Sequence, residues 1–171
     1  RDRPRGPAGA AKDGIGKLTL AADTTFTGNL TVLNGNLALG NGGATGSTLG
    51  AIHLANAGSI LTIGRSGDHT VGNLISGTGS LVLDGTGIRS LTQANTFSGT
   101  TAINVTAGVL RIGASGTPVP AGLDLTVAQG AAYDMFGNAS QFLKTLSGAG
   151  MVTNSAATQT LFFGGTSSTD V

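Results

Sequence analysis

The sequence predicts an all-β fold, a parallel β-helix (β-solenoid) of about six to seven coils, or rungs, each stacked on the one before it. Three observations predict this fold. Similar sequence motifs recur along the chain at a fixed interval. Apolar residues alternate with polar ones in short runs, and the composition favours strands over helices.

The repeated motifs are separated by about 72 residues. Residues 58–64 return as residues 130–137, and the Ser-Gly-x-Gly string of residues 76–79 returns as residues 147–150. The Thr-Phe-x-Gly string that ends at Gly28 returns with its last residue at Gly99. A β-sandwich has no physical reason to repeat its sequence at a fixed interval. A solenoid does, because each coil stacks on the one before it, and three coils of about 24 residues would make one repeat.

The composition supports strands. The chain has 171 residues with 30 Gly, no Cys and no Glu, and only 4% of its residues are aromatic. The absence of Glu and the abundance of Gly disfavour helices, while Thr and Val favour strands. The absence of Cys excludes disulfides and thiolate chemistry. No apolar run approaches the length of a membrane-spanning helix.

The charge and the alternating runs divide the chain into two parts. Residues 1–14 are predicted to be a basic tail rich in Pro and Gly, because they show no periodicity. Residues 15–171 are predicted to be one weakly acidic solenoid domain, built of units 15–75, 76–146 and a partial unit 147–171. Its strands are predicted in short runs, nearly all of them bounded by Gly, Asn, Asp or Ser: residues 17–20, 30–32, 37–39, 52–54, 60–63, 81–83, 101–103, 109–112, 123–127, 151–152 and 161–163.

A stacked coil explains these residue types. Leu, Ile and Val at inward positions would form columns, and Phe26 and Phe97 are expected to share one of them. Outward Thr, Ser and Asn would pair in ladders. Glycines such as Gly77 and Gly148 would supply the positive φ angles of the corners.

The string Asn95-Thr-Phe-Ser-Gly-Thr-Thr101, with the runs that flank it, resembles the autotransporter-associated β-strand repeat. This is the passenger repeat of bacterial type V secretion proteins. The resemblance covers residues 74–165 closely and residues 15–73 more loosely, since residues 28–30 lack a clean counterpart of Thr100 and Thr101. It implies a right-handed, single-stranded parallel β-helix that is exported and forms a shaft, with effector activity carried elsewhere.

Catalytic and metal-binding constellations are not expected. Asp84, Asp124 and Asp134 are dispersed along the chain, so they are interpreted as turn or strand-flank residues rather than as a glycosidase pair. His53 and His69 lack a third ligand at a useful spacing, so no metal site is predicted. The glycine-rich residues 40–46 lack the Lys of a phosphate loop. We expect no enzyme activity and no cofactor.

The leading functional hypothesis is a non-enzymatic structural protein, extracellular or on a bacterial cell surface, that stacks head to tail into a fibre. The sequence shows no capping segment at either end of the predicted solenoid. Open strand edges can pair with further strands, so a second copy is expected to stack there. The expected partner is therefore a second copy of this chain, with neither nucleic acid nor a membrane span involved. The candidate subunit-contact residues lie in the tail and in the first and last runs: Arg1, Arg3, Arg5, Lys12, Leu18, Leu20, Leu161, Phe162 and Phe163.

Two alternatives stay open. The first is an adhesin-type autotransporter passenger fragment whose outward Thr and Asn side chains contact host or matrix glycans. The second is a carbohydrate-active β-helix enzyme, which would depend on Asp84, Asp124 or Asp134.

Overall fold

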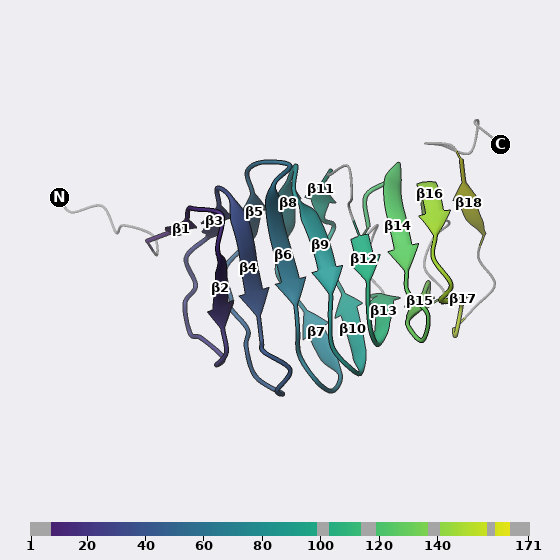
Figure 1. The fold of residues 1–171 in the computed structure, drawn as a ribbon, viewed down its shortest axis with the longest axis horizontal. Coiled ribbons are helices and arrows are strands. Elements are labelled where there is room, and N and C mark those ends of the chain that lie inside the picture. The colour runs from purple at the N-terminus through teal and green to yellow at the C-terminus, as the bar shows by residue number, and fades with distance from the viewer. Residues whose placement is uncertain (1–7, 99–102, 114–118, 137–140, 157–159, 165–171) are drawn as a thin grey trace.

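In the computed structural model, the chain is a parallel β-solenoid of about seven turns, which confirms the predicted fold class. The structure describes residues 8–98, 103–113, 119–136, 141–156 and 160–164, except for the side chain of Phe163. The coils follow one another along the long axis of the molecule, from the purple N-terminal end to the yellow C-terminal end (Figure 1). Every pairing between the described strands is parallel.

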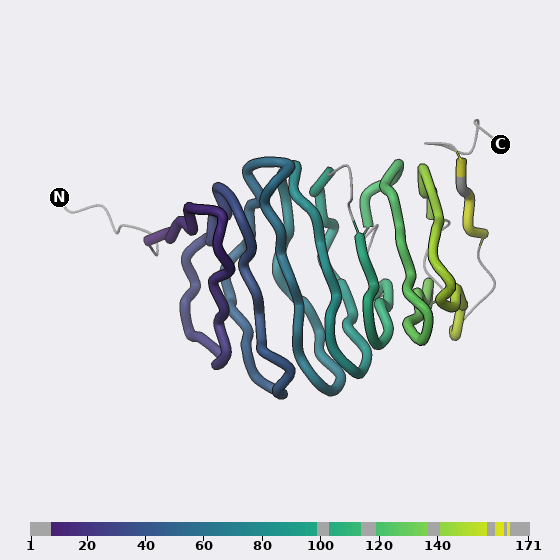
Figure 2. Tube along the Cα trace, in the orientation of Figure 1, coloured from purple at the N-terminus to yellow at the C-terminus, as the bar shows by residue number. Residues whose placement is uncertain are grey.

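Three sheets form the walls of the solenoid. The coils in the middle of the rod, such as β8, β9 and β10, take one strand from each sheet in chain order, and the tube trace shows each coil closing onto the next (Figure 2). The long sheet contains β2 (Lys17–Leu20), β4 (Gly35–Leu39), β6 (Ser59–Ile63), β9 (Ser80–Leu83), β12 (Ile103–Val105), β14 (Leu123–Val127), β16 (Gln141–Ser147) and β18 (Leu161–Phe163).

The two shorter sheets are offset along the rod. The N-terminal sheet contains β1 (Ala10–Lys12), β3 (Leu30–Val32), β5 (Ile52–Leu54), β8 (Ile75–Gly77) and β11 (Thr96–Phe97). The C-terminal sheet contains β7 (His69–Val71), β10 (Ile88–Leu91), β13 (Val109–Ile112), β15 (Ala132–Asp134) and β17 (Met151–Thr153).

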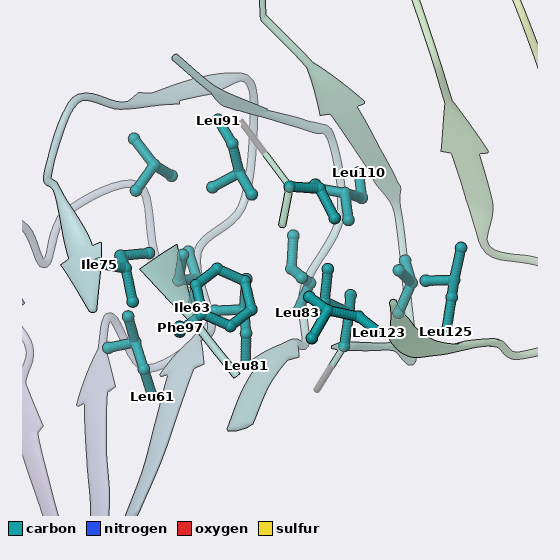
Figure 3. Close-up of a cluster of buried hydrophobic side chains, with 14 of the residues drawn as sticks. Leu61, Ile63, Ile75, Leu81, Leu83, Leu91, Phe97, Leu110, Leu123 and Leu125 are labelled. Atoms are coloured by element: carbon teal, nitrogen blue, oxygen red, sulfur yellow. The ribbon is translucent and has the colours of Figure 1, made fainter. Parts of the chain in front are cut away.

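Aliphatic columns fill the interior. Leu37 pairs in register with Leu61, Leu61 with Leu81, Leu81 with Ile103 and Ile103 with Leu125, and all five side chains are buried. Figure 3 shows Leu61, Leu81 and Leu125 among the inward side chains of this core. Burying a side chain of this size contributes about 1.5–3 kcal/mol, so stacked columns substitute for the large rings that the composition lacks.

Polar side chains form ladders on the outside, as expected. The Thr126 and Ser147 hydroxyls lie 2.9 Å apart on β14 and β16, and Asn36 Nδ2 donates to Thr62 Oγ1 at 3.0 Å across β4 and β6. On the N-terminal sheet, His53 Nδ1 lies 3.0 Å from Ser76 Oγ. Each of these pairs spans adjacent coils, so the ladders connect neighbouring turns of the rod.

The repeat of about 72 residues is longer than three coils, which take about 66 residues between Leu37 and Ile103. The segment that recurs therefore moves to another wall, because β6 lies in the long sheet and its sequence counterpart β15 lies in the C-terminal sheet. The unit boundaries after residues 75 and 146 fall inside β8 and β16. The division into units stays a prediction.

The same mismatch explains one wrong prediction. Phe26 and Phe97 do not share a column. Phe97 is buried in β11 and pairs with Gly77, whereas Phe26 is half-buried in the segment before β3.

The first strand lies within the segment expected to be a tail. β1 pairs with β3, and Ala10 N donates to Asn29 O at 2.9 Å. Backbone pairing of this kind needs no alternation of side chains, so the Ala10-Ala11 sequence carried no indication of it. Arg1, Arg3 and Arg5 lie outside the described residues.

Candidate functional site

The three carboxylates considered for catalysis are not brought together. Asp124 lies on the long sheet and accepts a hydrogen bond from Thr145 Oγ1 at 2.6 Å. Asp84 follows β9, at the opposite end of the strands of that sheet, and is exposed. Asp134 lies on the C-terminal sheet and is buried. This separation does not form the facing pair that glycoside hydrolysis requires.

The histidines also lie on different walls. His53 is on the N-terminal sheet, beside Ser76, and His69 is on the C-terminal sheet. Burial, followed by the charge of Arg65, lowers the pKa of His69, so its imidazole is neutral at pH 7. No group of three or more His, Asp, Glu or Cys that could hold a metal ion occurs within the described ranges.

The glycine-rich loop of residues 40–46 is closed by a carboxylate from the preceding coil. Asp23 Oδ1 accepts hydrogen bonds from Gly46 N at 3.0 Å, Ser47 Oγ at 2.7 Å and Arg65 Nη1 at 2.9 Å. The hydrogen bond from Ser47, followed by that from Arg65, lowers the pKa of Asp23. The Asp23 carboxylate therefore takes the hydrogen bonds that a bound phosphate would need from this loop. The loop acts as a corner of the solenoid.

The candidate subunit-contact residues within the described chain lie at its two ends. Leu18 and Leu20 of β2 pair in register with Leu37 and Leu39, so they continue the inward aliphatic columns, and Leu18 is 46% exposed. Lys12 donates from Nζ to Gly14 O at 2.6 Å and to Asn34 O at 2.8 Å. At the other end Leu161 is half-buried in β18. The ring of Phe162 stacks on that of Phe142 with centroids 4.8 Å apart.

Three arginines in successive coils form a feature that the sequence interpretation missed. Arg65 lies in the corner between β6 and β7, and Arg89 and Arg111 lie in β10 and β13, at intervals close to one coil. Arg89 is fully buried and donates to the carbonyl oxygens of Gly87, at 2.7 Å, and Arg65. The matching spacing of these residues in the sequence was the one available indication.

Arg111 belongs to a side-chain cluster on the outward face of the C-terminal sheet. Its Nε donates to Asp134 Oδ2 at 3.0 Å, and its Cζ lies 4.3 Å from the centre of the Phe136 ring. Asp134 also accepts from the Phe136 and Ser155 backbone N–H groups, each at 3.0 Å, and from Ser155 Oγ at 2.7 Å. Burial raises the pKa of Asp134, but these hydrogen bonds outweigh burial and hold the pKa below its ordinary value.

A hollow of about 250 Å³ opens beside Arg111 on the same face. Its lining comes from β7, β10, β13 and the residue before β7: Asp68, His69, Thr70, Ile88, Ser90 and Arg111. Thr70 pairs with Ser90 and Ser90 with Arg111 across the parallel strands. Hydroxyl, carboxylate and guanidinium groups therefore share one depression in the wall of the solenoid.

A parallel β-solenoid with aliphatic columns inside and polar ladders outside defines a structural class of elongated repeat proteins. Over 100 residues, the chain is 36% identical to the "Adhesin BmaC autotransporter" of Brucella suis biovar 1 (strain 1330). The match covers 54% of this chain and 3% of that adhesin. This similarity and the solenoid fold agree with the resemblance to the autotransporter passenger repeat.

No protein-family model matches the chain, and no solved structure matches it. Within the described residues, the structure contains no helix long and apolar enough to cross a membrane.

Proposed function

We propose that this chain is a non-enzymatic shaft segment of a bacterial adhesin that is secreted or displayed on the cell surface. The unbroken stacking of coils carries the proposal, since the inward column runs in register from Leu37 to Leu125. In such an array each coil contacts mainly its neighbours, so length grows with coil number and the outer walls stay free. The similarity to an autotransporter adhesin supports the cellular setting.

The dispersal of the carboxylates supports a non-enzymatic role. Asp84 and Asp124 lie at opposite ends of strands in the long sheet, and Asp134 lies on another wall. Asp134 is also committed to Arg111 and Ser155 rather than free for proton transfer.

Labelling of intact bacteria tests the proposed location. We expect an antibody raised against residues 8–164 to label unpermeabilised cells that make the full-length protein. Labelling of a periplasmic protein in the same cells serves as the control for envelope integrity. Signal that appears only after permeabilisation would contradict the proposal.

Head-to-tail assembly is a second candidate, and an apolar hollow at the β1 and β2 edge favours it. This hollow, of about 60 Å³, is lined by Ala10, Ala11, Lys12, Leu18, Leu20, Leu30, Thr31, Val32 and Leu37. A strand edge of a second copy would cover it and extend the inward columns by one coil.

Replacing Leu18 by Asp tests this assembly. We expect the sedimentation coefficient of the wild-type chain to rise with concentration, and that of Leu18→Asp to rise much less, because a carboxylate would be buried at the contact. Leu49→Asp is the matched control, since Leu49 is 65% exposed outside the strands. A wild-type chain that stays monomeric at high concentration would rule out the assembly.

A further inference from the structure

The guanidinium of Arg111 is held in one orientation. Asp134 binds its Nε edge, and the Phe136 ring covers one of its faces. In the described part of the chain, the hydrogen bonds of Arg111 end at Asp134, which leaves both Nη atoms for another acceptor. The side chain is 25% exposed. An arginine fixed in this way loses little conformational freedom when it binds a planar oxyanion.

The backbone at Phe136 is unusual. Phe136 has a φ of 47°, and it is the one non-glycine residue with positive φ among the described residues. The left-handed region is unfavourable for an aromatic residue, and residues held there cluster at binding sites. Here the hydrogen bond from Phe136 N to Asp134 Oδ1 stabilises the turn that brings the ring to Arg111.

The hollow beside Arg111 offers more than one kind of polar group. Arg111 provides donors, Thr70 and Ser90 provide hydroxyls, and the exposed Asp68 provides a carboxylate acceptor. Asp68 Oδ1 accepts from Ile88 N at 2.9 Å, which fixes its position at the rim. A bare inorganic anion would meet Arg111 but also the repulsion of Asp68. A ligand with an acidic group and several hydroxyls would satisfy both residues.

The charges behind the hollow favour an acidic ligand. Arg65 and the fully buried Arg89 lie on the neighbouring coils, and Arg65 is paired with Asp23. Arg89 has no carboxylate within ion-pair distance in the described chain, so its positive charge contributes to the field at this wall. Burial lowers the pKa of Arg89, while the negative charges of Asp68 and, more weakly, Asp84 act to raise it.

We infer that the hollow formed by Asp68, Thr70, Ser90 and Arg111 binds one saccharide unit of an acidic polysaccharide, with Arg111 Nη atoms on its carboxylate or sulfate and Asp68, Thr70 and Ser90 on its hydroxyls. This inference rests on the proposed surface location, because the ligand belongs outside the cell. Asp134 and Phe136 act as positioning residues for Arg111.

The test measures binding of three probes to the whole chain by calorimetry at low ionic strength. The probes are a hyaluronan octasaccharide, which carries carboxylates, a heparin octasaccharide, which carries sulfates, and inorganic sulfate. We expect one of the two oligosaccharides to bind and inorganic sulfate to bind at least about tenfold more weakly. The oligosaccharide that binds identifies the acidic group.

Two variants separate a built site from general charge attraction. Arg111→Lys keeps the charge but loses the planar fork, and Asp134→Asn frees the guanidinium while it makes the chain one charge more positive. We expect both to weaken oligosaccharide binding by about tenfold or more. Lys144→Gln removes one positive charge at an exposed position of β16, away from the hollow, and should change binding by less than about twofold if general charge attraction does not dominate.

Three results would overturn the inference: no binding of either oligosaccharide by the folded wild-type chain, tighter binding by Asp134→Asn, or unchanged binding by Arg111→Lys. Circular dichroism and thermal melting check that Asp134→Asn is folded, and Arg111→Lys decides the matter if it is not. A chain that labels on intact cells but does not bind would refute this site and leave the shaft function standing.

Discussion

Replacing Gly77 by Ala is expected to destabilise the chain by about 3 kcal/mol or more, an effect reserved for severe backbone or core disruption. Gly77 ends β8 with a φ of 103°, and a Cβ there would lie 2.0 Å from the carbonyl oxygen of Leu54. That oxygen belongs to β5 of the adjacent coil, so relief would require separating two paired strands. Denaturant unfolding followed by circular dichroism measures the loss.

Two other glycines provide controls for this effect. Gly67 has a φ of 70° but open space around it, so Gly67→Ala should cost only the conformational term of about 1–2 kcal/mol. Gly72 has open space and no positive φ, so Gly72→Ala should change the stability by about 1 kcal/mol or less. Equal losses at all three positions would show that close stacking of the coils does not limit the corner at Gly77.

The alternating runs predicted most strands of the long sheet, but β7, β10 and β15 of the C-terminal sheet were not among them. The success on the long sheet has a physical reason. Residues 61–63 and 123–127 place Leu, Ile or Val at every second position, and this period of two determines which side chains face the core. The tight corners, where Gly77 and Gly148 have φ near 100°, were also indicated by their glycines.

The length of a coil could not be derived from the repeated text. Coils between Leu18 and Leu146 vary from about 19 to 24 residues, because corners absorb insertions without disturbing the stacked strands. Similar sequences about 72 residues apart therefore lie on different walls of the solenoid. β1 was missed because its sequence, Ala-Ala-Lys, does not alternate apolar and polar residues.

The cluster around Arg111 was predictable only in part. Asp134 was noticed as a carboxylate, but its partner lies one coil earlier, at a separation that means contact only once the coil length is known. Nothing in the sequence indicated the positive φ of Phe136, because aromatic residues rarely adopt it. Cation–π contacts of this kind depend on the turn, which the structure supplies.

Removing one whole coil is expected to leave a folded, shorter shaft, whereas removing half a coil should unfold it. Leu81 pairs with Ile103, so deletion of residues 81–102 joins Ser80 to Ile103 and lets β12 stack on β6 as β9 did. Deletion of residues 81–91 removes β10 and all of β9 except Ser80, and puts the following corner where an inward strand is needed. The aliphatic columns would then lose their register across every later coil.

Small-angle scattering of the two deletion variants, with their thermal melting, tests the stacked coil as the unit of this shaft. The 81–102 variant should melt cooperatively and be shorter than the wild-type chain by about 4.8 Å, the spacing of one strand. The 81–91 variant should show the dimensions of an unfolded chain. If both variants fold equally well, or if both unfold, the coil is not the structural unit and the shaft function loses its basis.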